Sequence, residues 1–114
     1  MPTERLRIRP ADGTWVIRAG DAVLGETSRA LEVEEENSLP VIYFPREDIG
    51  MEFFDRSETV ATDPFKGNST YYSIVTPDGV ITDACWSFET PKHGAERIAG
   101  YVAFYPSRVT LEQL

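Results

Sequence analysis

The segment spanning residues 70–84 constrains the fold of this chain more than any other. Two β-prone runs, residues 70–75 and 80–84, flank Pro77-Asp78-Gly79. Proline presets φ and glycine tolerates a left-handed backbone, so these three residues predict the short loop of a β-hairpin. The fold must therefore contain an antiparallel strand pair in this half of the chain.

Further short strands are expected elsewhere. They fall at residues 6–9, 15–17, 22–24, 30–34, 41–44, 101–105 and 108–111. Gly20-Asp21 predicts a second hairpin. In residues 30–34, Leu31 and Val33 alternate with glutamates and should share one face. Residues 41–44 are a continuous apolar run, typical of a strand buried on both faces or lying at a sheet end.

Two segments have helical character. Residues 46–54 predict a turn or two of helix, weakened by Gly50, and residues 93–99 predict a brief helix carrying Ile98. The expected fold class is therefore mainly β, with compact antiparallel sheets in a barrel-like or bent two-sheet arrangement and one or two short helices. We expect the core to contain Trp15, Ile17, Tyr43, Phe44, Ile74, Trp86, Val102 and Phe104.

Length and charge limit the organisation and the classes of partner. The chain has 114 residues, which predicts a single domain over residues 1–114. A net charge of −8 with dispersed basic residues argues against nucleic-acid binding. No apolar run approaches the roughly 20 residues that span a bilayer, and the first ten residues lack an apolar signal segment. We expect a soluble, cytoplasmic protein that does not bind membranes.

Metal, disulfide and thiol chemistry have weak signals. Glu32, Glu34, Glu35 and Glu36 form the strongest charge run, which is more typical of a solvated edge or loop than of a cation site. Cys85 is the only cysteine, so neither an intrachain disulfide nor a multi-cysteine zinc site is available. It should be a buried, inert thiol on the opposite face of its strand from Trp86. The alternative, a Cys85–His93 pair, would need His93 to leave an exposed loop. No metal ion and no cofactor are expected.

Several segments, taken together, resemble the bacterial domain of unknown function family 427. They are Tyr43-Phe44-Pro45-Arg46-Glu47-Asp48; Pro64-Phe65-Lys66-Gly67 followed by Tyr71-Tyr72-Ser73; Asp83-Ala84 with Trp86 and Pro91; and residues 98–105. The resemblance implies a compact β fold similar to the β-tent architecture of the Mss4-like and methionine-sulfoxide-reductase groups, with no assigned reaction.

Two departures from these patterns matter. Asp63 stands where many family members have cysteine, so a cysteine-based activity at that position is not expected. The zinc-binding members of the β-tent group use paired Cys-x-x-Cys motifs, and this sequence has none.

A candidate ligand site centres on Lys66, in the loop Asp63-Pro64-Phe65-Lys66-Gly67. An ammonium group among aromatic residues can contact a carboxylate or phosphate of a ligand. The plainer alternative is that Lys66 is solvent-exposed or pairs with Asp63 or Asp83. Tyr43, Asp48, Tyr72 and Trp86 could line the same concavity, although core packing or helix capping would also explain them. Phe65-Lys66-Gly67-Asn68-Ser69 is not a phosphate-binding loop of the Walker type, because its Lys-Gly order is wrong.

The leading interpretation is a small β domain that binds a small, possibly anionic ligand through Lys66, Tyr43, Asp48, Tyr72 and Trp86, with no catalytic residue assigned. The first alternative is a structural module that forms a homodimer through strand edges. The second is an enzyme with Asp48 or Asp83 as general base, which predicts a carboxylate with a raised pKa within reach of Lys66.

Overall fold

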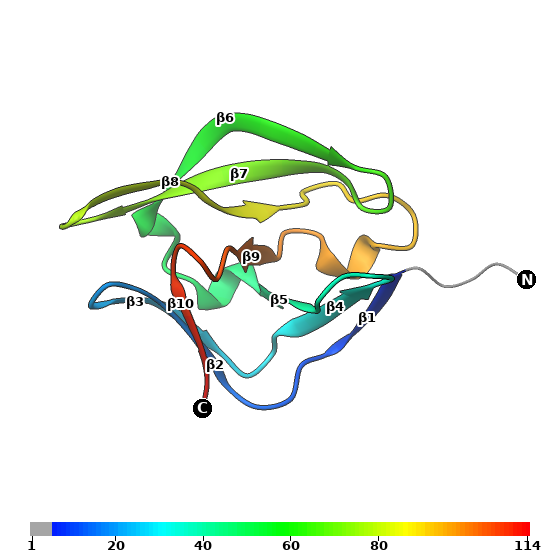
Figure 1. Cartoon of the computed structure of the whole chain (residues 1–114), viewed down its shortest axis with the longest axis horizontal. Coiled ribbons are helices and arrows are strands. Elements are labelled where there is room, and N and C mark those ends of the chain that lie inside the picture. Colours follow the sequence, from blue (N-terminus) through cyan, green and yellow to red (C-terminus); the bar gives the residue numbers. More distant parts are fainter. Residues whose placement is uncertain (1–5) are drawn as a thin grey trace, which may run out of the picture.

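The computed structural model describes residues 6–114, so the prediction about the start of the sequence lies partly outside the described residues (Figure 1). The strands are β1 (Leu6–Pro10), β2 (Trp15–Ala19), β3 (Ala22–Thr27), β4 (Leu31–Glu35), β5 (Val41–Phe44), β6 (Phe54–Asp63), β7 (Gly67–Thr76), β8 (Gly79–Ser87), β9 (Val102–Phe104) and β10 (Thr110–Gln113). In this part of the chain, no helix is long and apolar enough to cross a membrane.

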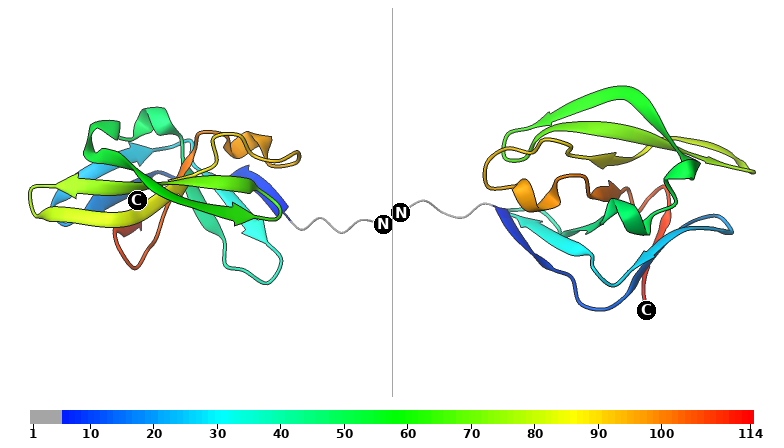
Figure 2. Two further views of the ribbon diagram at one scale, coloured as in Figure 1. Left: turned by 90° about the horizontal axis from the view of Figure 1, so that it is seen from above. Right: turned by 180° about the vertical axis from the view of Figure 1, so that it is seen from behind.

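The strands form two antiparallel sheets. The larger has the order β1-β4-β5-β9-β8-β7-β6, and the smaller has the order β10-β2-β3. The larger sheet is strongly bent, so that β6, β7 and β8 lie on the side of the molecule opposite β1 and β2 (Figures 1 and 2). The expected mainly β class is confirmed. Of the two arrangements expected, the bent one is correct, because the described strands do not close into a barrel and β1 and β6 remain edges.

The predicted short helices are 3₁₀ turns instead. They are η1 (Arg46–Asp48), η2 (Met51–Phe53) and η3 (Glu96–Ile98). Backbone hydrogen bonds of the i to i−3 type close η1, from Ile49 to Arg46 at 3.2 Å, and η2, from Phe53 to Gly50 at 3.0 Å. Gly50 separates η1 from η2, so neither extends into an α-helix. Ile98, which η3 carries, is buried.

The bent sheet has a hydrophobic core on each face. Phe44, Cys85, Val102 and Phe104 belong to the core shared with the small sheet, where Ile17 and Leu24 also pack. Tyr43 and Ala103 point to the other face and join the second core, against which Trp86 packs. Because neighbouring strand residues face opposite sides, both faces of β5 are buried. This explains the continuous apolar run of residues 41–44, and it places Cys85 and Trp86 on opposite faces as predicted.

The expected core is correct except at its tryptophans. Ile17, Tyr43, Phe44, Ile74, Val102 and Phe104 are buried, whereas Trp15 and Trp86 are only partly buried and pack against the two cores. The hairpins at Gly20 and Gly79 are confirmed, and both glycines have positive φ, at 60° and 132°. The exposed side of Trp86 faces the concavity described below.

Candidate functional site

The loop that carries Lys66 is the turn of the β6–β7 hairpin. Asp63 pairs with Gly67 across the ladder, which leaves Pro64, Phe65 and Lys66 as the connection. One carboxylate oxygen of Asp63 accepts the backbone N–H groups of Phe65 at 2.8 Å and Lys66 at 2.9 Å. Gly67 has φ of 104°, which suits the residue that closes a three-residue hairpin loop. The local sequence therefore fixes the backbone of Lys66.

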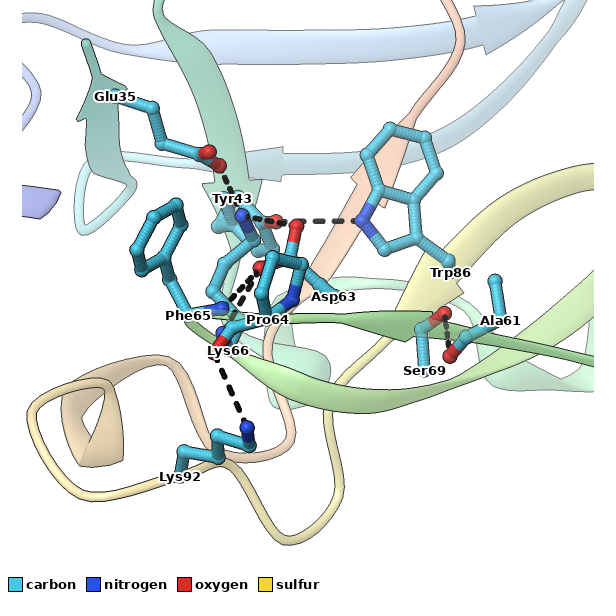
Figure 3. Close-up of polar contacts among 10 residues, drawn as sticks. All are labelled: Glu35, Tyr43, Ala61, Asp63, Pro64, Phe65, Lys66, Ser69, Trp86 and Lys92. Carbon is cyan, nitrogen blue, oxygen red and sulfur yellow. Dashed lines mark hydrogen bonds and ion pairs between the residues drawn. The ribbon is translucent and has the colours of Figure 1, made fainter. Parts of the chain in front are cut away.

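The side chain of Lys66 is buried and paired with two carboxylates. Its residue is 5% exposed, and its ammonium group donates to Asp63 Oδ2 at 2.9 Å and to Glu35 Oε1 at the end of β4 (Figure 3). The nitrogen also lies 5.7 Å from the centre of the Phe88 ring. Of the two pairings considered from the sequence, that with Asp63 is present, while Glu35 takes the place considered for Asp83.

Lys66 lies in the wall of a concavity of about 260 Å³, which we call the aromatic pocket. The pocket opens beside the second core, and β4, β5, β6, β7 and β8 all contribute to it. Its lining residues are Glu35, Val41, Tyr43, Ala61, Thr62, Asp63, Lys66, Ser69, Tyr71, Trp86, Phe88 and Tyr105. Charged and apolar groups thus converge in one small volume, as is usual for small-molecule sites.

The aromatic side chains of the pocket hold one another in place. The rings of Trp86 and Tyr105 lie 4.6 Å apart between centres, and Tyr71 stacks on Tyr105 at 6.4 Å. The hydroxyl groups of Tyr71 and Tyr105 are hydrogen-bonded at 3.0 Å. Trp86 Nε1 donates to the hydroxyl of Tyr43 at 3.2 Å (Figure 3). The aromatic wall is therefore pre-arranged by contacts within the protein.

The side chains that line the pocket carry a net negative charge. Burial opposes ionisation of Asp63, but hydrogen bonds from the Lys66 ammonium and from the Phe65 and Lys66 amides lower its pKa below the usual value. Burial raises the pKa of Tyr43, and the negative charges of Glu35 and Asp63 raise it further. Burial and the hydrogen bond with Tyr71 raise the pKa of Tyr105 to about 12. One positive and two negative side chains meet here, so their combined formal charge is −1 at neutral pH.

Two residues predicted for this site lie elsewhere. Tyr72 is on the opposite face of β7 from Tyr71, where its hydroxyl donates to Glu89 Oε2 at 3.0 Å. Asp48 is in η1, where it accepts hydrogen bonds from Thr27 Oγ1 at 2.7 Å and Arg29 Nη2 at 3.1 Å. Neither lines the aromatic pocket, whereas Lys66, Tyr43 and Trp86 do.

The general-base hypothesis has no support from the two aspartates proposed for it. Hydrogen bonds from Thr27 and Arg29 lower the pKa of Asp48, and hydrogen bonds from Ser57 and Thr59 lower that of Asp83. Among residues 6–114, Lys66 forms ion pairs only with Glu35 and Asp63. The raised pKa that this hypothesis predicts beside Lys66 is therefore not found at Asp48 or Asp83.

Cys85 and His93, which the alternative thiol hypothesis would pair, lie in different surroundings. Cys85 is fully buried, its thiol lies 3.6 Å from the Tyr72 carbonyl oxygen, and burial raises its pKa to about 12. The His93 side chain is exposed and pairs with Glu96 at 3.1 Å. The described part of the chain contains no group of three or more His, Cys, Asp or Glu side chains that could hold a metal ion.

Sequence reasoning missed Glu35, Tyr71 and Tyr105 as pocket residues. Tyr71 pairs with Trp86 in the β7–β8 ladder, but the register of this ladder shifts between Tyr72 and Ile74, so counting back from the predicted hairpin loop does not place the two opposite each other. Tyr72 pairs with Cys85 instead and must face the other way. For Glu35 the local pattern gave no signal, since its partner Lys66 lies 31 positions further along the chain.

Two further concavities are present. One adjoins the aromatic pocket, and the other lies at the β1 edge of the large sheet. An apolar hollow of about 340 Å³ lies beyond Trp86 and Tyr105 and includes Leu39, Ile42 and Leu111. Another, of about 410 Å³, is lined by residues of β1 with Gly94 and Arg97. Arg7 and Arg9, which line it, pair with glutamates of β4. Of the three, only the aromatic pocket contains a buried charged side chain.

Fold and site together define a small, mainly β protein with a polar, aromatic-walled pocket. The chain belongs to the family described as domain of unknown function (DUF427), whose family model matches residues 7–113. A search of curated proteins found no match. Family membership agrees with the resemblance seen in the sequence and assigns no activity.

Proposed function

We propose that this protein binds a small organic molecule in the aromatic pocket. The observation that carries the proposal is that the buried Lys66 ion group and the pre-arranged aromatic rings line the same pocket. Burying a charged group costs free energy, and packing alone does not require one at this position. Replacing such groups by apolar residues of similar size is often neutral or stabilising. A ligand that contacts this group would account for its position.

The possibility of an anionic ligand depended on a free ammonium group at Lys66. Two carboxylates already pair with that group, and they leave a formal charge of −1. We therefore base the proposal on the shape and aromatic walls of the pocket, and not on an attraction between Lys66 and an anion. Lys66 acts here by orienting Glu35 and Asp63.

Thermal-shift screening of amines, carboxylates, phosphates and sugars tests this proposal. A compound that binds the native state raises the melting temperature. Hits should stabilise the wild type but not Tyr105→Leu, which removes one wall of the pocket. Tyr101→Leu is the matched control, because Tyr101 is also half-buried but lies outside the pocket lining.

Two outcomes would contradict pocket binding. One is a screen in which no compound stabilises the wild type. The other is a set of hits that stabilise Tyr105→Leu as strongly as they stabilise the wild type and Tyr101→Leu, since binding would then occur elsewhere.

Self-assembly is the second candidate function, and the edge strand β6 favours it. Within residues 6–114 this strand of ten residues pairs with β7 on one side and with no strand on the other, which leaves an edge that another chain could extend. A homodimer would extend the large sheet across this edge. The mass in solution distinguishes this candidate from a monomeric ligand-binding protein.

Kinship with the Mss4-like β-tent proteins, a bacterial source, a cytoplasmic location and a single domain over residues 1–114 remain predictions. The proposed ligand-binding function requires none of them.

A further inference from the structure

We infer that the ligand of the aromatic pocket is a small organic cation that carries an ammonium group. This inference rests on the proposed binding function and specifies the chemistry of the ligand. Three features of the pocket support it: the unequal exposure of its charges, an unused carboxylate oxygen and the arrangement of its rings.

The groups that a ligand would meet in this pocket are negative. The side chain of Lys66 is 6% exposed, whereas those of Glu35 and Asp63 are 26% and 29% exposed. The positive charge thus lies behind the negative ones. A ligand entering from solvent reaches the carboxylates before it reaches the ammonium group, so electrostatic attraction favours a cation.

One carboxylate oxygen is free to contact such a ligand. Asp63 uses Oδ1 for two backbone amides and Oδ2 for Lys66. Glu35 uses only Oε1, and Oε2 accepts no hydrogen bond from any residue between 6 and 114. Glu35 Oε2 is therefore the acceptor we assign to the ligand's positive group.

The walls offer the second element of cation recognition. Tyr71, Trp86 and Tyr105 are each only partly buried and lie within 6.4 Å of one another between ring centres. The face of an aromatic ring attracts ammonium groups, with tryptophan the strongest, and the attraction grows when water is excluded. Rings together with a carboxylate select a cation over a neutral molecule of the same shape.

An anion meets the opposite conditions in this pocket. It would approach two partly exposed carboxylates, and the one ammonium group there already donates to both. The net charge of the whole chain, −8, also attracts cations and repels anions at long range.

Matched probe pairs test the inference on the wild-type protein by calorimetry. Choline is compared with the uncharged alcohol in which carbon replaces the ammonium nitrogen, and butylammonium is compared with butanol. In at least one pair the cation should bind about tenfold more tightly, as expected for about 1.4 kcal/mol of cation–π and carboxylate attraction. Raising the salt concentration should narrow this difference.

Variants locate the selectivity within the pocket. Glu35→Gln keeps the shape of the side chain and should reduce the preference for the cation severalfold. Glu34→Gln is the matched control, because Glu34 lies on the same strand but faces Arg7 and Arg9. It should retain the wild-type preference. Melting temperatures of both variants report whether they fold.

The outcomes separate this inference from the proposed function. If cation and isostere bind equally, or if the anions of the screen bind best, at a site sensitive to Tyr105→Leu, then the pocket binds ligands but the inference is wrong. The inference is also wrong if neither the cations nor their neutral counterparts bind while other compounds of the screen bind at the site sensitive to Tyr105→Leu. Should Glu35→Gln fail to fold, the probe pairs on the wild type still decide.

Discussion

Lys66 holds the carboxylates of Glu35 and Asp63 together, and these three groups set the charge of the aromatic pocket. A buried ammonium group needs hydrogen-bond partners that replace water. Asp63 supplies one partner from the same turn, and Glu35 supplies the other from a distant strand. Because Lys66 and Asp63 stabilise each other, protonation of Asp63 should lower the stability of the fold.

The pH dependence of stability tests this coupling. The pKa of Asp63 is lowered in the folded protein from the usual 3.8, so the unfolded chain binds more protons as the pH falls. Its stabilisation is fully present above about pH 4 and is lost as the pH drops through the folded pKa. Asp63→Asn should cost about 1 to 2 kcal/mol at pH 7. Urea unfolding of both proteins from pH 7 to pH 3 measures the difference.

The difference in the free energy of unfolding between the wild type and Asp63→Asn should become smaller as the pH falls. A cost that stays constant over the whole range would show that Asp63→Asn acts through packing or loop geometry, and would contradict the ionic role assigned to Asp63.

Prediction at the residue scale was accurate where the information was local. Strand alternation is enough to place Cys85 and Trp86 on opposite faces. Whether Tyr71 or Tyr72 shares the face of Trp86 depends on the register of the β7–β8 ladder, which shifts between Tyr72 and Ile74 and does not follow from the sequence. Glu35 and Asp48 show the limit of such reasoning. The bend of the sheet brings Glu35 to Lys66, whereas Thr27 and Arg29 hold Asp48 elsewhere, and neither contact follows from spacing in the sequence.

The β6–β7 hairpin is the element that delivers Lys66 and Asp63 to the pocket. Its three-residue loop depends on Gly67, whose φ of 104° is unfavourable for residues with a Cβ atom. A Cβ added there would lie 3.4 Å from the backbone nitrogen of Lys92, which itself donates to the Lys66 carbonyl oxygen at 2.9 Å. These contacts are ordinary in length, so the cost of a side chain here comes from backbone strain at the residue next to Lys66.

We expect Gly67→Ala to lower the free energy of unfolding by about 1 to 2 kcal/mol. Asn68→Ala, a change at the exposed neighbouring position, should stay within about 0.5 kcal/mol of the wild type. Urea denaturation of the three proteins measures both effects. Equal stability of Gly67→Ala and wild type would contradict the dependence of the loop on glycine.

Strand β6 was missing from the sequence interpretation, for a physical reason. An edge strand with solvent on both faces needs no apolar alternation, and only Phe54 of its ten residues is buried. The strand is held by its pairing with β7, a non-local interaction that residue pattern alone does not reveal. By contrast, β5 and β8 have buried residues, and the sequence predicted both.

At the scale of the whole molecule, the bend of the large sheet creates the site. In the large sheet, β9 and β8 lie between β5 and the β6–β7 hairpin. Because the sheet curves, β4 and β5 nevertheless approach this hairpin. Among the described strands, β6 is the last in this sheet and forms a long edge. Whether that edge joins a second copy decides between the two candidate functions.

The composition of β6 disfavours pairing with another chain. Asp55, Arg56 and Glu58 place charges along the strand, and the ladder register shifts between Arg56 and Val60. Charges and bulges are the usual devices that keep edge strands from associating. We therefore expect size-exclusion chromatography with light scattering to give the mass of one chain, 12.8 kDa, independent of protein concentration. A mass of twice this value that persists on dilution would contradict the expectation and would favour self-assembly through β6 over a monomeric binding protein.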